Sequence, residues 1–80
     1  MIKHKYTFKQ GQYLAFIYYY TKINGRPPSE SNIQNYFKVT WPSVHRMVIT
    51  LEQRELIKRT PGKARSIQLL ISTDELPKLK

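Results

Sequence analysis

The most constraining feature of this chain is a pair of helical apolar patterns that are joined by a three-residue turn. Ile33 and Phe37 lie four apart, so they share one face of a helix that begins after Ser29, a residue type favoured at helix N-caps. A second helix is predicted over residues 42–54, and its inward positions are Val44, Met47, Val48 and Leu51. The connection Lys38-Val39-Thr40 has the length of a tight turn, which predicts a helix-turn-helix.

A longer helix is predicted before this pair. Thr7 and Gln10 have the spacing of a capping box, and the helix that they start is expected to end near Asn24-Gly25. Its apolar face is formed by Tyr13, Phe16, Ile17 and Tyr20. In the tyrosine run 18–20 the last ring points inward and the first two flank the outer side. Base stacking by this run is less favoured, because stacking platforms usually place their aromatic residues on strands.

Two strands are predicted after the helices, over residues 56–59 and 66–71. Pro61-Gly62 between them fits the centre of a type II turn, and the resulting hairpin needs the helices beneath it for stability. Three helices followed by a hairpin define a mainly α fold with a small β-hairpin, the winged helix-turn-helix. We expect one domain over residues 1–71, with a short basic N-terminal arm, followed by a polar C-terminal tail over 72–80.

Composition narrows the possible functions. The chain has 80 residues and no cysteine, which bounds it to one small core without disulfides or cysteine-ligated zinc. The two histidines, His4 and His45, are remote from each other in the predicted fold, so no metal site is expected. The sequence offers no carboxylate pair in a cleft, no Ser/His/Asp arrangement and no glycine-rich phosphate loop. We therefore expect no enzyme, no cofactor and no small-molecule ligand.

The charge of the chain favours a polyanionic partner. Fourteen Lys and Arg residues stand against five acidic ones, giving a formal net charge of +9. The acids are Glu30, Glu52, Glu55, Asp74 and Glu75. Residues 1–29 and 56–73 therefore carry only positive charge among their ionised side chains. The first residues lack an apolar run long enough for a signal peptide or a membrane span, so a cytoplasmic location is expected.

The third predicted helix has an outer strip opposite its apolar stripe. The strip centres on Pro42, Arg46, Ile49 and Gln53, with Ser43 and Thr50 on one edge and His45 on the other. Such a strip suits a DNA major groove. Arg46 is expected to bind guanine O6 and N7, Ser43 a base edge or phosphate, and Ile49 a thymine methyl.

Trp41-Pro42 stands at the leading tip of that helix. Proline is tolerated in a first helical turn because its missing N–H would have no partner there. Trp41 has two open roles, closing the turn against the preceding helix or packing on sugar and base edges of DNA. His45 is expected to be a surface or phosphate-contacting residue.

The predicted hairpin is strongly basic. Its cations are Lys58, Arg59, Lys63 and Arg65, and no acidic residue stands near them in the sequence. This suits a wing that rests on phosphates or reaches the minor groove, although a charged hairpin also protects a solvated sheet edge. With Lys3, Lys5 and Lys9, the protein is expected to neutralise about six phosphates, so log affinity should fall with log salt at a slope near −5.

These residues resemble the N-terminal winged-helix domain of the LexA repressors over roughly residues 6–71. The motifs that carry the resemblance are Thr7-x-x-Gln10, Asn24-Gly25-x-Pro27-Pro28-Ser29 with Ile33, Ser43-Val44-His45-Arg46, Leu51-Glu52-x-x-x-Leu56-Ile57-Lys58-Arg59 and Lys63-Ala64-Arg65-Ser66-Ile67. The chain departs from the family at Trp41-Pro42, where small polar residues are common, and at Met47, where a histidine or similar residue is frequent. Glu55 occupies the usual glycine position, where a positive φ would cost strain.

The resemblance implies a bacterial-type transcriptional regulator, most simply a repressor, that binds double-stranded DNA. Ser43, His45 and Arg46 match the part of the family's helix that approaches operator bases, and Lys63 with Arg65 matches its wing. Full family members carry a second, Ser-Lys peptidase domain that also forms the dimer, so a homodimer on two half-sites is an expectation from the family. This chain is expected to be a fragment of such a repressor or a stand-alone member.

The alternative is a winged-helix module that binds an acidic protein partner and has only non-specific affinity for nucleic acid. Its apolar anchors would be Leu14, Tyr18 and Trp41.

Overall fold

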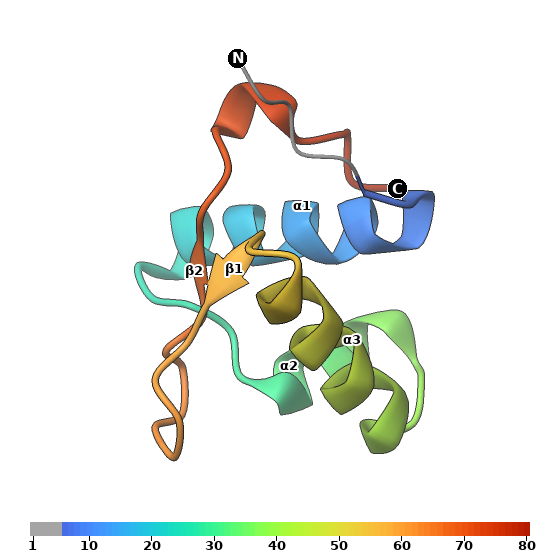
Figure 1. The fold of residues 1–80 in the computed structure, drawn as a ribbon, viewed down its shortest axis with the longest axis vertical. Coiled ribbons are helices and arrows are strands. Elements are labelled where there is room, and N and C mark those ends of the chain that lie inside the picture. The colour runs from blue at the N-terminus through green and yellow to red at the C-terminus, as the bar shows by residue number, and fades with distance from the viewer. Residues whose placement is uncertain (1–5) are drawn as a thin grey trace.

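Figure 1 shows the computed structural model of the protein, which describes residues 6–80. Over these residues the chain forms three α-helices, a two-stranded antiparallel sheet and a short 3-10 helix. In chain order the elements are α1 (Phe8–Asn24), α2 (Glu30–Phe37), α3 (Trp41–Gln53), β1 (Ile57–Lys58), β2 (Gln68–Leu69) and η1 (Thr73–Glu75). The predicted winged helix-turn-helix architecture is confirmed.

α1 begins and ends at the predicted signals. The Thr7 side chain accepts a bond from the Gln10 backbone N–H (3.1 Å), and the Gln10 side chain accepts one from the Thr7 N–H (3.0 Å). Together these bonds satisfy two N–H groups that the first turn of a helix leaves without partners. At the other end Gly25 has a φ of 76°, a left-handed conformation that glycine adopts at little cost.

α1 is the central layer of the molecule. In Figure 1, α2 and α3 lie on one side of it and the C-terminal segment lies on the other. As a result residues 10–17 are all buried, including two glutamines. Tyr13 stacks on Phe37 of α2 with ring centroids 4.4 Å apart, and desolvation by burial raises the pKa of the Tyr13 phenol above its ordinary 10.0. The phenol therefore stays neutral in the core to a more alkaline pH.

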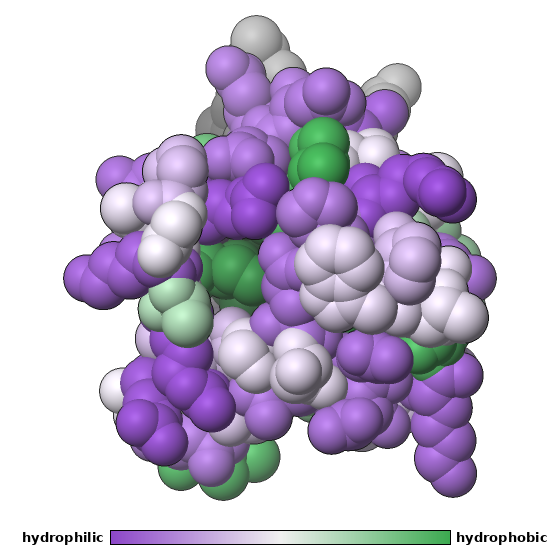
Figure 2. All heavy atoms as spheres, turned by 90° about the horizontal axis from the view of Figure 1, so that it is seen from below, coloured by the Kyte–Doolittle hydropathy of each residue, from purple (hydrophilic) through white to green (hydrophobic). Residues whose placement is uncertain are grey.

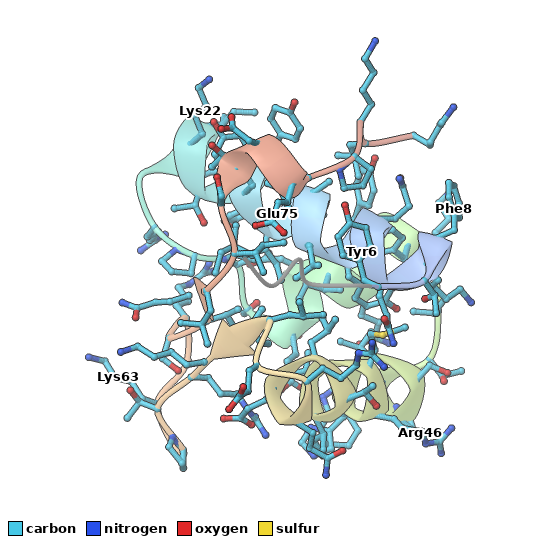
Figure 3. All side chains as sticks on the ribbon, turned by 45° about the horizontal axis from the view of Figure 1, so that its top comes forward. Tyr6, Phe8, Lys22, Arg46, Lys63 and Glu75 are labelled. Carbon is cyan, nitrogen blue, oxygen red and sulfur yellow. The ribbon has the colours of Figure 1, made fainter. Side chains whose placement is uncertain are left out.

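The C-terminal segment, predicted as a polar tail, is bound to α1. The amide of Gln12 donates to the Lys78 carbonyl (2.9 Å) and accepts from the Lys80 N–H (2.7 Å). The Tyr6 hydroxyl donates to the Glu75 carbonyl, and these two residues lie close together in Figure 3. Leu76 and Leu79 also pack against the core. The polar composition of this segment hid these contacts, because they depend on a few residues that are spaced apart.

α3 is anchored through one face and held by a cap. The side chains of Val44, Val48 and Leu51 are fully buried. The helix starts at Trp41, one residue before the predicted start, because the Thr40 side chain accepts from the Ser43 N–H as its N-cap. α2 ends at Phe37 because Lys38 turns into the left-handed region with a φ of 55°. The tight turn is thus made by residues 38–40.

The wing has shorter strands than the sequence predicts. Ile57 pairs with Leu69 and Lys58 with Gln68, so the ladder covers only part of the predicted 56–59 and 66–71. Beyond the ladder the Ser66 hydroxyl bonds the carbonyls of Thr60 (3.2 Å) and Lys63 (2.9 Å). These side-chain bonds replace strand pairing and close the loop. Gly62 has a φ of 76° and the Lys63 N–H bonds the Thr60 carbonyl (3.1 Å), as the predicted type II turn requires.

Candidate nucleic-acid interface

The outer face of α3 carries the side chains that the sequence selects for reading DNA. Pro42, Ser43, Arg46 and Gln53 are exposed, and His45, Ile49 and Thr50 are half-buried. Figure 3 shows Arg46 pointing away from the body of the protein. Because the opposite face is fixed in the core, this strip is presented on a rigid element.

Two hydroxyls on this face also bond within the protein. The Ser43 hydroxyl accepts from the Thr40 hydroxyl (3.0 Å), and the Thr50 hydroxyl donates to the Arg46 carbonyl (2.9 Å). The hydroxyl proton of Thr50 is therefore donated within the helix, while the hydroxyl oxygen can still accept a hydrogen bond.

Trp41 is not buried against α2. Half of its surface is exposed (50%), and its ring stacks on His45 one turn along α3, with centroids 4.8 Å apart and planes 12° from parallel. It also lines a cleft of about 270 Å³ whose other walls are the start of α2 and the wing residues 63–67. Figure 2, which views the molecule from below, shows mainly hydrophilic residues around a hollow with a hydrophobic floor.

His45 belongs to a cluster that links α2, α3 and the wing. Its Nδ1 lies 3.2 Å from one carboxylate oxygen of Glu30, the first residue of α2. The other Glu30 oxygen lies 3.4 Å from Nη1 of Arg59, and Nε of Arg59 lies 3.1 Å from Glu52. Arg59 follows β1 directly, so the cluster joins the base of the wing to both helices. The sequence placed Arg59 among cations with no acid near them, and folding brings two carboxylates to it.

The wing cations divide into outward and inward groups. All four of them line a groove of about 560 Å³ beside the wing. Lys58 and Lys63 are exposed, and Figure 3 shows Lys63 at the wing tip pointing outward. Arg65, which is also predicted to contact DNA, directs Nη1 into the protein. That nitrogen lies 3.0 Å from Asn32 Oδ1 and 3.3 Å from both the Tyr20 hydroxyl and the Pro27 carbonyl.

One predicted phosphate contact joins the interface from α1. Lys9 lines a cleft with Ser43, Arg46 and Thr50, which places a cation from α1 beside the outer face of α3. Lys3, His4 and Lys5 of the predicted arm lie outside the described residues.

Within residues 6–80 no group of three or more His, Cys, Asp or Glu side chains is arranged to hold a metal ion. No helix in that part of the chain is both long and apolar enough to pass through a membrane.

The sequence reasoning missed the role of Glu30. It was noted only as one of five acids, yet its carboxylate contacts both His45 of α3 and Arg59 at the base of the wing. Its place immediately after the N-cap Ser29 was visible, but its partners lie 15 and 29 positions away. Nothing in the local pattern could have identified them.

Comparison with known proteins agrees with this geometry. Residues 3–66 match the family described as the LexA DNA binding domain. Among curated proteins, the LexA repressor of Thermosipho melanesiensis is 42% identical over 66 residues, which cover 82% of this chain and 33% of that protein. The LexA repressor of Bartonella quintana is 35% identical over 65 residues, covering 80% of this chain and 27% of that protein. The chain thus spans a third or less of the length of these relatives. It belongs to the LexA DNA-binding domain family, and DNA is its implied partner.

Proposed function

We propose that this protein binds double-stranded DNA sequence-specifically and regulates transcription, acting as a repressor. In this proposal α3 enters the major groove and the wing lies on the backbone. The observation that carries it is the outer face of α3, where Arg46 projects from a helix whose opposite face is fixed in the core. A helix held in this way can present the same side chains to every operator that it meets.

The base-reading residues of the proposal lie along the first three turns of α3. Trp41 and Pro42 lead, Ser43 and Arg46 follow, and His45, Ile49 and Thr50 complete the strip. We assign hydrogen bonds with base edges to Arg46 and Ser43, and an apolar contact with a thymine methyl to Ile49.

The backbone contacts of the proposal come mainly from Lys63, Lys58 and Lys9. Arg59 and Arg65 have partners inside the protein, so we assign them to holding the wing in place. Removing these two arginines from the expected about six phosphate contacts leaves about four. The slope of log affinity against log salt should then be near −4.

Selection from random oligonucleotides at near-physiological salt tests this function. An enriched site supports sequence-specific binding, and a palindromic site supports a homodimer on two half-sites. Arg46→Ala should relax the preference at one base position and cost about 1–3 kcal/mol of binding free energy. Lys22→Ala, which removes an exposed cation from the last turn of α1, is the matched control. A footprint that is unchanged in Arg46→Ala would show that this residue does not read a base.

The protein-binding alternative loses one of its three anchors. Leu14 has no exposed surface and cannot contact a partner. Tyr18 does line an apolar cleft of about 440 Å³ between α1 and β2. Absence of any enriched site in the selection experiment would favour this alternative.

A further inference from the structure

Glu30 of α2 contacts the imidazole of His45 on α3. As the first residue of α2, it contacts His45 of α3 through one carboxylate oxygen and Arg59 through the other. Its side chain is only 21% exposed, and that of His45 is 37% exposed. A carboxylate that bonds through both oxygens has little rotational freedom, so the direction from which it meets the imidazole is set.

The contact with Glu30 decides which nitrogen of His45 carries the proton in the neutral ring. A carboxylate can only accept hydrogen bonds, so Nδ1, which lies 3.2 Å from it, must be the donor. In a neutral imidazole the other nitrogen, Nε2, then has a free lone pair and acts as an acceptor. The same arrangement, in which a carboxylate bonds one ring nitrogen and sets the tautomer, orients histidines in many metal sites.

Trp41 restricts the same imidazole from a second direction. Its ring lies nearly parallel to that of His45 at a centroid distance of 4.8 Å. Stacking resists tilting of the ring, and the bond to Glu30 resists a flip about the side-chain axis. The imidazole is therefore held both in its plane and in its tautomer before any ligand arrives.

We propose that Glu30 is a positioning residue for base reading, which keeps Nε2 of His45 as a hydrogen-bond acceptor for an exocyclic amino group in the major groove. This inference rests on the proposed function. The groups with that chemistry are the N6 amino group of adenine and the N4 amino group of cytosine. Guanine O6 and thymine O4 are acceptors and would meet the lone pair of Nε2 unfavourably, so His45 discriminates against them.

The role of Arg59 follows from the same cluster. By binding Glu30 and Glu52 together, Arg59 ties the carboxylate that orients His45 to the base of the wing. Glu52 touches Arg59 but has no contact with His45 among those found in residues 6–80. Glu52→Ala is therefore a matched control, because it removes a carboxylate from the cluster and leaves the partner of the imidazole in place.

Nitrogen NMR of protein labelled in its histidines tests the tautomer without DNA. Spectra are recorded at about pH 8, where an ordinary imidazole is neutral, and the His45 signals are identified by their loss in His45→Gln. The wild-type protein and Glu52→Ala should both show the Nδ1–H form. Glu30→Ala should shift the balance toward Nε2–H, and Glu30→Gln should restore Nδ1–H because its amide oxygen still accepts. An Nε2–H ring in the wild type, or an unchanged ring in Glu30→Ala, would overturn the inference.

Selection with the variants tests the consequence for DNA. Glu30→Ala and His45→Ala should both lose preference for adenine or cytosine at one and the same position, by about 3- to 10-fold for one hydrogen bond. The double variant should lose no more than His45→Ala alone, and Glu52→Ala should keep the preference. Additive losses, or losses at different positions, contradict a role through His45. A wild type that enriches no site contradicts the proposed function itself, whereas a wild type with a site that Glu30→Ala leaves unchanged contradicts only this inference.

Discussion

The two faces of α3 differ in what they contact and therefore in what a mutation there should change. Val44, Val48 and Leu51 have no exposed surface and fix the helix on the core, whereas Pro42 and Arg46 are exposed on the other side. Burial of apolar side chains is the main source of stability in a small core, and exposed polar side chains contribute little to it. Under the proposed function, stability and DNA reading are carried by different residues of one helix, so mutations should separate them.

The largest expected effect is on the inner face. Leu51→Ala leaves a cavity in the core and should lower the free energy of unfolding by about 2–5 kcal/mol. Gln53→Ala, two positions further along, should change it by less than about 0.5 kcal/mol. Denaturant unfolding followed by circular dichroism measures both. If the two substitutions lowered the free energy of unfolding equally, the proposed difference between the two faces of α3 would be wrong.

Two wing cations extend the comparison beyond α3. Arg65→Ala removes charged hydrogen bonds to Asn32, Tyr20 and Pro27, and should cost about 1–3 kcal/mol of stability. Lys63→Ala should leave stability within about 0.5 kcal/mol of the wild type and flatten the salt slope by about 1, weakening all DNA sequences alike. Unfolding curves and binding at several salt concentrations check this pair. If Arg65→Ala left stability unchanged and lowered the slope as Lys63→Ala does, Arg65 would be a backbone contact after all.

A smaller effect is expected where α3 connects to the wing. Glu55 has a φ of 61°, as its place at the usual glycine position of the family suggested. Glu55→Gly relieves that strain and should raise the free energy of unfolding by about 0.5–1 kcal/mol. Arg46→Gly, at an exposed position in the interior of α3, should lower it by a similar amount, about 0.5–1 kcal/mol. Thermal unfolding of the two variants tests both expectations. A loss of stability in Glu55→Gly would show that the Glu55 side chain contributes more stability than its positive φ costs.

Features that depend on neighbouring residues could be predicted from the sequence. The Thr7–Gln10 capping box, the N-cap at Ser29, the end of α1 at Gly25 and the turn at Pro61-Gly62 each involve residues within a few positions of one another. Hydrophobic spacing then identified the inner face of α3, because burial of one helix face leaves a regular pattern.

Features that depend on distant residues could not be predicted in the same way. The bonds of Arg65 cross 33 to 45 positions, and those of Gln12 to the C-terminal segment cross 66 and 68. Which of several cations near a wing turns inward depends on where carbonyls and amides lie after folding. The sequence therefore indicated a basic wing correctly and could not say that two of its arginines bond within the protein.

The central claim is that the outer face of α3 binds DNA while its inner face packs on the core. Its most direct test is an amide NMR titration of the protein with the duplex that selection yields. We predict that the largest shift changes fall on residues 41–46 and 61–64, with little change in the C-terminal segment at 72–80. Changes concentrated instead on α1 and β2, around the cleft that Tyr18 lines, would contradict the account. They would place the binding surface on another part of the molecule.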